Sequence, residues 1–110
     1  MIVVVAKYLI PKGYVAITIF PFIILDSLTN KGNKVLLNHE KIHLKQQLEL
    51  LILPFFIWYF LEYLYRLFQF KKHNIAYRNI SFEREAYSND KDLDYLSKRK
   101  LFGFLAYINV

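Results

Sequence analysis

Between residues 50 and 70 the sequence carries only two charged side chains, Glu62 and Arg66, and this apolar stretch limits the fold more than any other feature. The two charges lie four residues apart, so on a helix they share one face and can pair. The pattern predicts a helix over residues 55–70, FFIWYFLEYLYRLFQF, whose remaining surface is broad and apolar. Such a helix is buried in its domain, docked on a protein partner, or laid into a membrane surface.

The apolar segments are nevertheless short for membrane spans. The longest uncharged runs cover residues 13–25 and 50–61, and a transmembrane helix needs about 20 residues. The N-terminal MIVVVAKYLIPKG does not resemble a signal peptide, because it has no basic first region, Lys7 interrupts the apolar run, and no small-residue cleavage site follows. We therefore expect a protein that is cytoplasmic or lies peripherally at a membrane.

The composition limits the number of domains and the kinds of site. A chain of 110 residues predicts a single domain over 1–110. There is no cysteine, so a metal ion must be held by His, Asp or Glu. The net charge of +6 suits anionic surfaces, but the basic clusters at 71–72 and 98–100 lack a nucleic-acid-binding motif. We expect no nucleic-acid partner and place both clusters on the solvated surface, with a basic membrane contact near 98–108 as the alternative.

The N-terminal quarter predicts a β-hairpin. Residues 2–10 are rich in β-branched side chains, Pro11-Lys12-Gly13 provides a turn, and residues 14–25 follow as the second strand. Pro21 has no amide hydrogen to donate to a neighbouring strand, so it marks an edge or a bulge. The polar loop 26–34 ends this part of the chain.

From Val35 the apolar period becomes that of a helix, and Pro54 breaks or kinks it before the helix over 55–70. One face of this first helix, about a third of its circumference, carries Leu36, Leu37, His39, Glu40, His43, Gln47 and Leu50.

Two further helices are expected after the polar break at 71–74. One carries FEREAYSN and is capped by Asn79 or Ser81, and the last covers about 92–107, weakened by Gly103. The sequence therefore predicts an α+β protein, in which an N-terminal hairpin or small sheet packs on a mostly helical domain with a long first helix.

The segment His39-Glu40-Lys41-Ile42-His43 has the spacing of a metal site. Residues four apart lie one above the other on a helix, so both imidazoles can reach a single metal ion, and zinc accepts neutral imidazole nitrogens. Glu40 lies about 100° around the helix, where it can take a proton from a water that the metal has acidified without itself being a ligand. The alternative is an ordinary amphipathic helix with a polar face.

A third ligand is expected from a later element. Glu83 and Glu85 are the acidic candidates, and on a helix they point about 160° apart, so only one of them can coordinate the metal. His73 has no partner at helical spacing. Gln46 and Gln47 lie near the same side of the first helix, where a surface position is favoured over a contact with the metal site.

HEKIH followed by FEREAY resembles the gluzincin metallopeptidases, whose pattern is HExxH and a later E-x-x-A-[DN] on a second helix. It is similar to minimal gluzincins and to the catalytic cores of integral-membrane zinc peptidases. The resemblance implies a zincin-like domain with one zinc ion per chain, held by His39, His43 and Glu83, and Glu40 as the general base. Tyr87 departs from the family pattern, in which an acid or asparagine supports a zinc-binding histidine.

That departure leaves the support of the histidines open to Glu85 or to a glutamine. A donor for the developing oxyanion is also needed, and the candidates by residue type are His73, Tyr77, Arg78 and Tyr87.

The resemblance implies a zinc-dependent metallopeptidase, a hydrolase that cleaves a peptide or protein substrate through a metal-activated water. The alternative is a non-enzymatic membrane-surface or partner-docking protein built on the aromatic helix 55–70, with a structural or vestigial metal motif. Glu40 distinguishes the two hypotheses, because a structural zinc site has no use for a general base.

Overall fold

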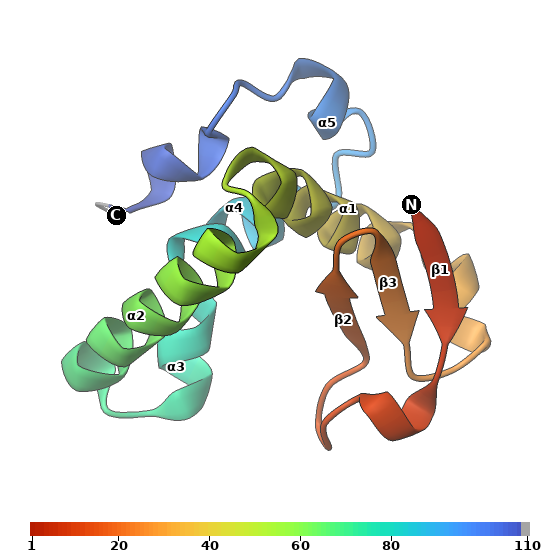
Figure 1. Ribbon diagram of the computed structural model, residues 1–110, viewed down its shortest axis with the longest axis horizontal. Coiled ribbons are helices and arrows are strands. Elements are labelled where there is room, and N and C mark those ends of the chain that lie inside the picture. Colours follow the sequence, from red (N-terminus) through yellow and green to blue (C-terminus); the bar gives the residue numbers. More distant parts are fainter. Residues whose placement is uncertain (109–110) are drawn as a thin grey trace.

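The computed structural model describes residues 1–108 as an α+β protein, with a small N-terminal sheet followed by helices, which confirms the predicted class (Figure 1). In chain order the elements are β1 (Ile2–Val5), η1 (Lys7–Leu9), β2 (Ala16–Ile19), β3 (Phe22–Leu25), η2 (Thr29–Gly32), α1 (Lys34–Glu49), α2 (Ile52–Phe70), α3 (His73–Arg78), α4 (Ser81–Asn89), α5 (Tyr95–Lys98) and η3 (Gly103–Tyr107).

The sheet has the order β1–β3–β2, with β1 parallel and β2 antiparallel to β3. The expected hairpin between 2–10 and 14–25 is therefore wrong. The second of these segments turns back on itself, and Ile19 pairs with Phe22 across a turn that contains Pro21. Proline has no amide hydrogen to give to a ladder, so it suits a turn better than the middle of a strand.

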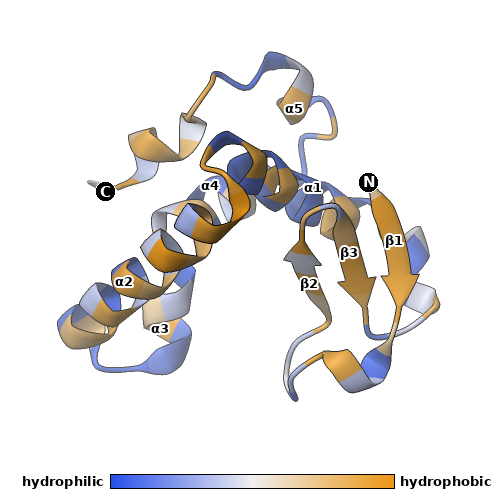
Figure 2. Cartoon of the chain, viewed as in Figure 1, coloured by the Kyte–Doolittle hydropathy of each residue, from blue (hydrophilic) through white to orange (hydrophobic). Residues whose placement is uncertain are grey.

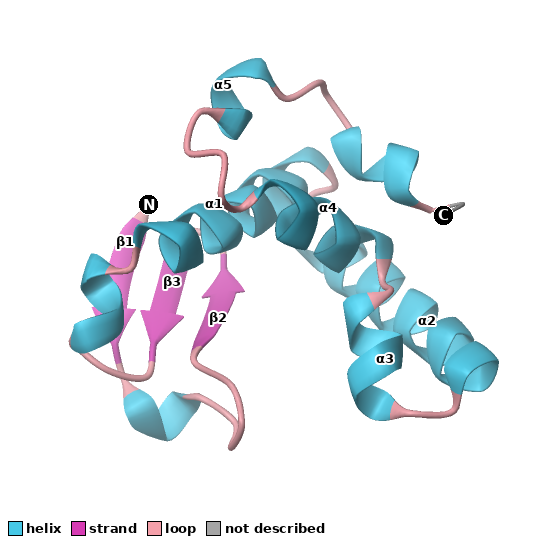
Figure 3. Ribbon diagram, turned by 180° about the vertical axis from the view of Figure 1, so that it is seen from behind, coloured by secondary structure: helices cyan, strands magenta, loops and turns pink. Residues whose placement is uncertain are grey.

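Helix α1 packs on one face of the sheet (Figure 3). Ile23 and Leu25 of β3 form a buried cluster with Leu44 of α1. The side chain of Asn33 caps the helix by accepting a hydrogen bond from the amide of Leu36 (3.1 Å). The long first helix of the sequence prediction is thus present, and it lies between the sheet and the remaining helices.

The helix breaks at Leu50 and Leu51, before Pro54, and α2 then leaves at 111° to α1. Leu51 takes a left-handed φ of 60° at this corner. Pro54 lies in the first turn of α2, where no amide hydrogen is needed within the helix. The proline position was therefore read correctly as a boundary, but the boundary lies three residues earlier. Among the described residues no single helix has the length and hydropathy of a membrane span, although α1 and α2 pass that test as a bent pair.

Helix α4 begins without either of the predicted caps. Ile80 is its N-cap residue, and the carboxylate of Glu62 on α2 accepts hydrogen bonds from the amide and the hydroxyl (2.6 Å) of Ser81. Oε2 of Glu62 also lies 3.7 Å from a guanidinium nitrogen (Nη2) of Arg66, so the predicted pair on α2 is confirmed. An acceptor from a distant helix thus replaces the local cap, and it ties α4 to α2.

The C-terminal segment does not form the predicted helix over 92–107. It contains only the short α5 and η3, separated by Phe102 in a left-handed conformation. Arg99 is not on the solvated surface, because its guanidinium lies between Glu49 (2.8 Å) and Glu85 (2.5 Å) and its side chain is 1% exposed. A Cβ on Gly103 would lie 2.7 Å from the Glu85 carboxylate, so glycine permits this close approach.

Candidate metal centre

His39 and His43 on α1 face Glu83 on α4. The Nε2 atoms of the two histidines are 3.2 Å apart, and Oε1 of Glu83 is 3.2 Å from each of them. All three residues are buried. Of the two glutamates that the sequence left open, the structure thus brings Glu83, the one that the resemblance implied, to the histidine pair, whereas Glu85 points into the contact with Arg99.

This triangle of atoms fits a tetrahedral metal ion. Zinc bonds of about 2.0–2.1 Å place two tetrahedral ligands about 3.3–3.4 Å apart, which is close to the 3.2 Å separations seen here. The residue types also match, because two imidazoles and one carboxylate are a common catalytic ligand set that leaves a fourth position open. The site can therefore hold a zinc ion with little rearrangement.

The second nitrogen of each imidazole is held by an oxygen. Nδ1 of His39 lies 3.1 Å from the Asp90 carboxylate, and Nδ1 of His43 lies 2.8 Å from Oε1 of Gln46. When Nδ1 donates to these oxygens, Nε2 of each neutral ring keeps its lone pair and directs it at Glu83. Two lone pairs and a carboxylate oxygen repel one another unless a proton or a metal cation lies between them.

Gln46 is buried, with 0% exposure, so the expected surface position is wrong. Its Nε2 donates to Oε1 of Glu85 (2.9 Å) and to the carbonyl oxygen of Phe82 (3.1 Å), which leaves its Oε1 facing His43. Arg99 in turn holds Glu85. The glutamine alternative for supporting a histidine is therefore the observed one, and Glu85 acts behind the glutamine.

Asp90 supports His39 in place of Tyr87, and the sequence prediction missed it. The Tyr87 ring instead packs edge-on against His39, with ring centroids 4.5 Å apart. Asn38 fixes Asp90 by donating to its backbone carbonyl (2.8 Å). Asp90 follows Glu83 by seven residues, and this two-turn spacing is the signal that could have identified it.

Helix α2 orients Glu83 from the other side. The hydroxyl of Tyr59 donates to Oε2 of Glu83 (2.7 Å), which leaves Oε1 for the histidines. Burial first, and then the charge of Glu83, raise the pKa of Tyr59 far above its ordinary value, so the hydroxyl stays a donor. The hydrogen bonds that Ser81 donates to Glu62 fix the start of α4 two residues before Glu83.

Glu40 lies beside the histidines, with Oε2 4.0 Å from Nε2 of His39. Its other oxygen, Oε1, accepts a hydrogen bond from the hydroxyl of Thr18 on β2 (2.7 Å). Gln47 locks β2 in place, because it donates to the carbonyl of Thr18 and accepts from the amide of Phe20, both at 2.7 Å. Gln47 is 1% exposed, so the expected surface position is wrong for it as well.

The electrostatics of the site favour a positive charge among these groups. Burial alone lowers the pKa of His43, but the charge of Glu83 outweighs it and raises that pKa to about 9. Burial alone raises the pKa of Glu83, but positive charge on His43 and hydrogen bonds from both histidines hold it well below its usual range. A metal cation placed between these groups meets the same stabilising field.

Two cavities reach Glu40. One of about 500 Å³ is bordered by His43 and Glu83 and by aromatic side chains of α2, and one of about 670 Å³ is bordered by His39 and Asp90. The residues that border both are Tyr14, Ala16, Glu40, His73 and Tyr77.

His73 lies where the two cavities meet and bridges two tyrosine side chains there. Its Nε2 hydrogen-bonds the hydroxyl of Tyr14 (2.6 Å) and its Nδ1 that of Tyr63 (2.8 Å), which joins the loop before β2 to α2 and α3. Tyr77 lies beside this bridge, and burial and the charge of Glu83 raise the pKa of its hydroxyl far above its ordinary value. Of the other oxyanion candidates, Arg78 borders the 670 Å³ cavity, where its guanidinium lies over the Tyr87 ring, 3.7 Å from its centroid.

Comparison of the chain with models of known protein families, with curated proteins and with solved structures gave no match.

Proposed function

We propose that this protein is a zinc-dependent metallopeptidase of gluzincin type. The observation that carries the proposal is the buried triangle of His39 Nε2, His43 Nε2 and Glu83 Oε1, each 3.2 Å from the others, with Glu40 beside it. These three side chains would hold one zinc ion per chain. When bound, zinc supplies a Lewis acid that polarises a peptide carbonyl and makes water easier to deprotonate.

Glu40 moves the proton in this reaction. Its Oε1 is held by Thr18, so its Oε2 takes the proton from the attacking water and then gives it to the leaving amine nitrogen. Asp90 and Gln46 keep the two imidazoles turned toward the metal. Tyr77 donates a hydrogen bond to the developing oxyanion, since it borders both cavities and its hydroxyl stays protonated.

The substrate would be a peptide or protein segment in extended form. Strand β2 is an edge strand, and Ala16, Ile17 and Thr18 border the 500 Å³ cavity. Gln47 already occupies backbone groups of Thr18 and Phe20. The edge near Ala16 is therefore the part that pairs with a peptide, because extended peptides dock by adding a strand to an exposed edge.

The test compares bound zinc and casein cleavage in the wild type, Glu40→Gln and His39→Ala. Glu40→Gln should keep its zinc and lose about 10²–10⁴-fold in cleavage rate, because the proton acceptor is gone while the ligands remain. His39→Ala should lose both. Equal cleavage by all three proteins would refute the proposal.

The second candidate function is a non-enzymatic protein that docks on a membrane or a partner, and the exposed apolar surface of α2 favours it. In that case Glu40→Gln leaves the protein's behaviour unchanged, because docking does not use a proton acceptor. Glutamine has the size of glutamate and can still accept the hydrogen bond from Thr18, so the substitution removes the charge of Glu40 with little effect on packing.

A further inference from the structure

Helix α2 carries apolar residues along its length (Figure 2), and several of them form an exposed ridge. The ridge consists of Leu53, Ile57, Phe60, Leu61, Leu64 and Phe68, which are 44–83% exposed. Their spacing of three and four residues places them along one side of the helix. A helix in water normally turns such a stripe inward, yet here the inward side of α2 is already occupied by Phe55, Tyr59 and Arg66.

The ridge lies between two hollows. On one flank Phe56 and Phe60 border the 500 Å³ cavity next to the candidate metal centre. On the other flank Ile57, Trp58 and Leu61 border a groove of about 960 Å³. An occupant of the ridge therefore also meets apolar side chains on both flanks.

The charges of the molecule indicate what this occupant is. Six of the nine carboxylates are turned inward, namely Glu40, Glu49, Glu62, Glu83, Glu85 and Asp90. The acids left nearer the surface are Asp26, Asp92 and Asp94, and Asp92 pairs with Lys98 (2.7 Å). Ten of the eleven lysines are exposed, so the surface is more basic than the net charge of +6 suggests.

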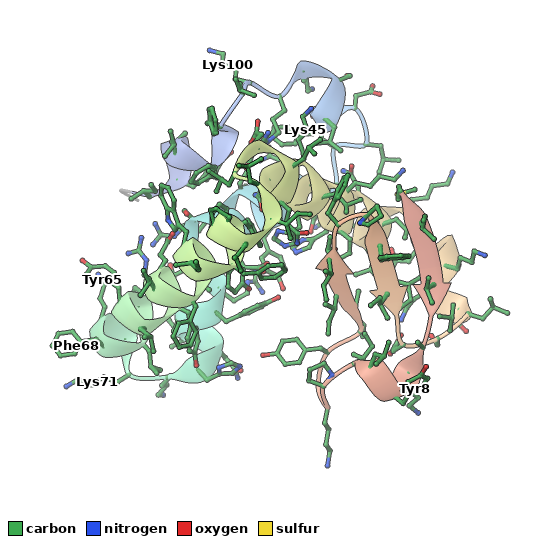
Figure 4. The ribbon with its side chains drawn as sticks, in the orientation of Figure 1. Tyr8, Lys45, Tyr65, Phe68, Lys71 and Lys100 are labelled. Carbon is green, nitrogen blue, oxygen red and sulfur yellow. The ribbon has the colours of Figure 1, made fainter. Side chains whose placement is uncertain are left out.

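We propose that the ridge docks on the surface of an anionic lipid bilayer. The apolar side chains enter the boundary between headgroups and acyl chains, and Lys71 and Lys72, directly after the helix, meet the lipid phosphates. Figure 4 shows Tyr65, Phe68 and Lys71 together at the far end of α2, directed away from the rest of the molecule. A second copy of this chain is a poorer occupant, because it brings the same positive surface.

If the proposed peptidase function holds, docking places the mouth of the 500 Å³ cavity at the bilayer surface, so that the substrates are peptide segments at that surface. The docking itself does not depend on catalysis or on bound metal. The docking test can therefore fail while the peptidase assay succeeds, and the peptidase assay can fail while the docking test succeeds.

The test is flotation of the full chain with vesicles of phosphatidylcholine and phosphatidylglycerol, beside vesicles of phosphatidylcholine alone. The wild type should float with the anionic vesicles. Leu61→Gln/Phe68→Gln should lower its partition coefficient at least about tenfold, because two large apolar contacts are lost. Lys71→Gln/Lys72→Gln should lower binding to anionic vesicles by about fivefold per lysine and remove most of its salt dependence.

The matched control is Tyr8→Gln/Leu28→Gln, which removes two side chains of similar exposure (88% and 72%) from the N-terminal part of the chain. It should float like the wild type. Circular dichroism of all three double variants checks that they fold.

Three results would overturn the proposal. The wild type could remain at the bottom with both vesicle types, or the folded ridge variant could float as well as the control. Alternatively, the wild type could form a concentration-dependent dimer that the ridge substitutions dissociate, which would make a second copy the occupant.

Discussion

Helices α1 and α2 follow one another in the chain and differ in what they bury and what they expose. Helix α1 turns polar groups inward: its buried residues are Asn38, His39, Glu40, Ile42, His43, Leu44, Gln46 and Gln47. Helix α2 buries only Phe55 and Arg66 and leaves leucine, isoleucine and phenylalanine outside. Both arrangements oppose the usual preference, which suggests that each is retained for a purpose other than folding.

The two arrangements differ in their energetic cost. A buried polar group is costly unless it is hydrogen-bonded, and within residues 1–108 only Glu49 Oε1 and Arg66 Nε are buried without a partner. Apart from Glu49 Oε1, the buried polar side-chain atoms of α1 are thus hydrogen-bonded, and its polar face contributes to the fold. An exposed apolar side chain contributes almost nothing, so the outer face of α2 should be dispensable for stability. Substitutions on the two helices test this difference.

On α1, the largest expected effect on stability is that of Gln47→Ala. It removes both bonds to β2 and leaves the carbonyl of Thr18 and the amide of Phe20 without partners, which should lower the free energy of unfolding by about 2–3 kcal/mol. Urea unfolding measures the change. Lys45→Ala, exposed on the same helix, is the control and should change it by less than about 0.5 kcal/mol. Similar values for the two variants would show that the polar face does not hold the sheet.

Asp90→Asn should act on metal binding more than on folding. The amide keeps the shape of the carboxylate but supports the His39 imidazole less strongly, so zinc affinity should fall about tenfold. Competition with a chromogenic chelator measures this affinity. Asp94→Asn, on an exposed residue, should leave it unchanged. If both variants bind zinc like the wild type, Asp90 does not support the metal site.

The smallest expected effect is that of Phe68→Gln on α2. Phe68 is 83% exposed, so its loss should change the free energy of unfolding by less than about 0.5 kcal/mol. Phe55→Ala on the buried side of the same helix should lower it by about 3–5 kcal/mol. A large loss of stability with Phe68→Gln would mean that the ridge takes part in folding, and the contrast between α1 and α2 would disappear.

Local patterns in the sequence predicted what is local in the structure. The spacing of His39 and His43 identified the helix and the side of it that faces Glu83, and the pair Glu62–Arg66 identified a face of α2. The burial of the polar face of α1 was not predictable. Periodicity shows which residues share a face of a helix, but it does not show whether that face is buried. This is why Gln46 was expected at the surface.

The remaining errors concern partners that are distant in the sequence. Parallel pairing of β1 with β3 depends on the whole domain, so the turn residues at 11–13 suggested a different hairpin. Arg99 meets Glu49 fifty residues earlier, and no local signal distinguishes it from the neighbouring surface lysines. Glu62 caps α4 from another helix in the same way.

The metal content of purified protein tests the central claim most directly. We expect one zinc ion per chain in the wild type and in Glu40→Gln, and a strong loss of zinc in Glu83→Gln, because Glu83 lies 3.2 Å from both imidazoles whereas the proposed role of Glu40 is that of the base. Loss of zinc in Glu40→Gln with retention in Glu83→Gln, or a wild type that binds no zinc when it is supplied, would contradict this assignment.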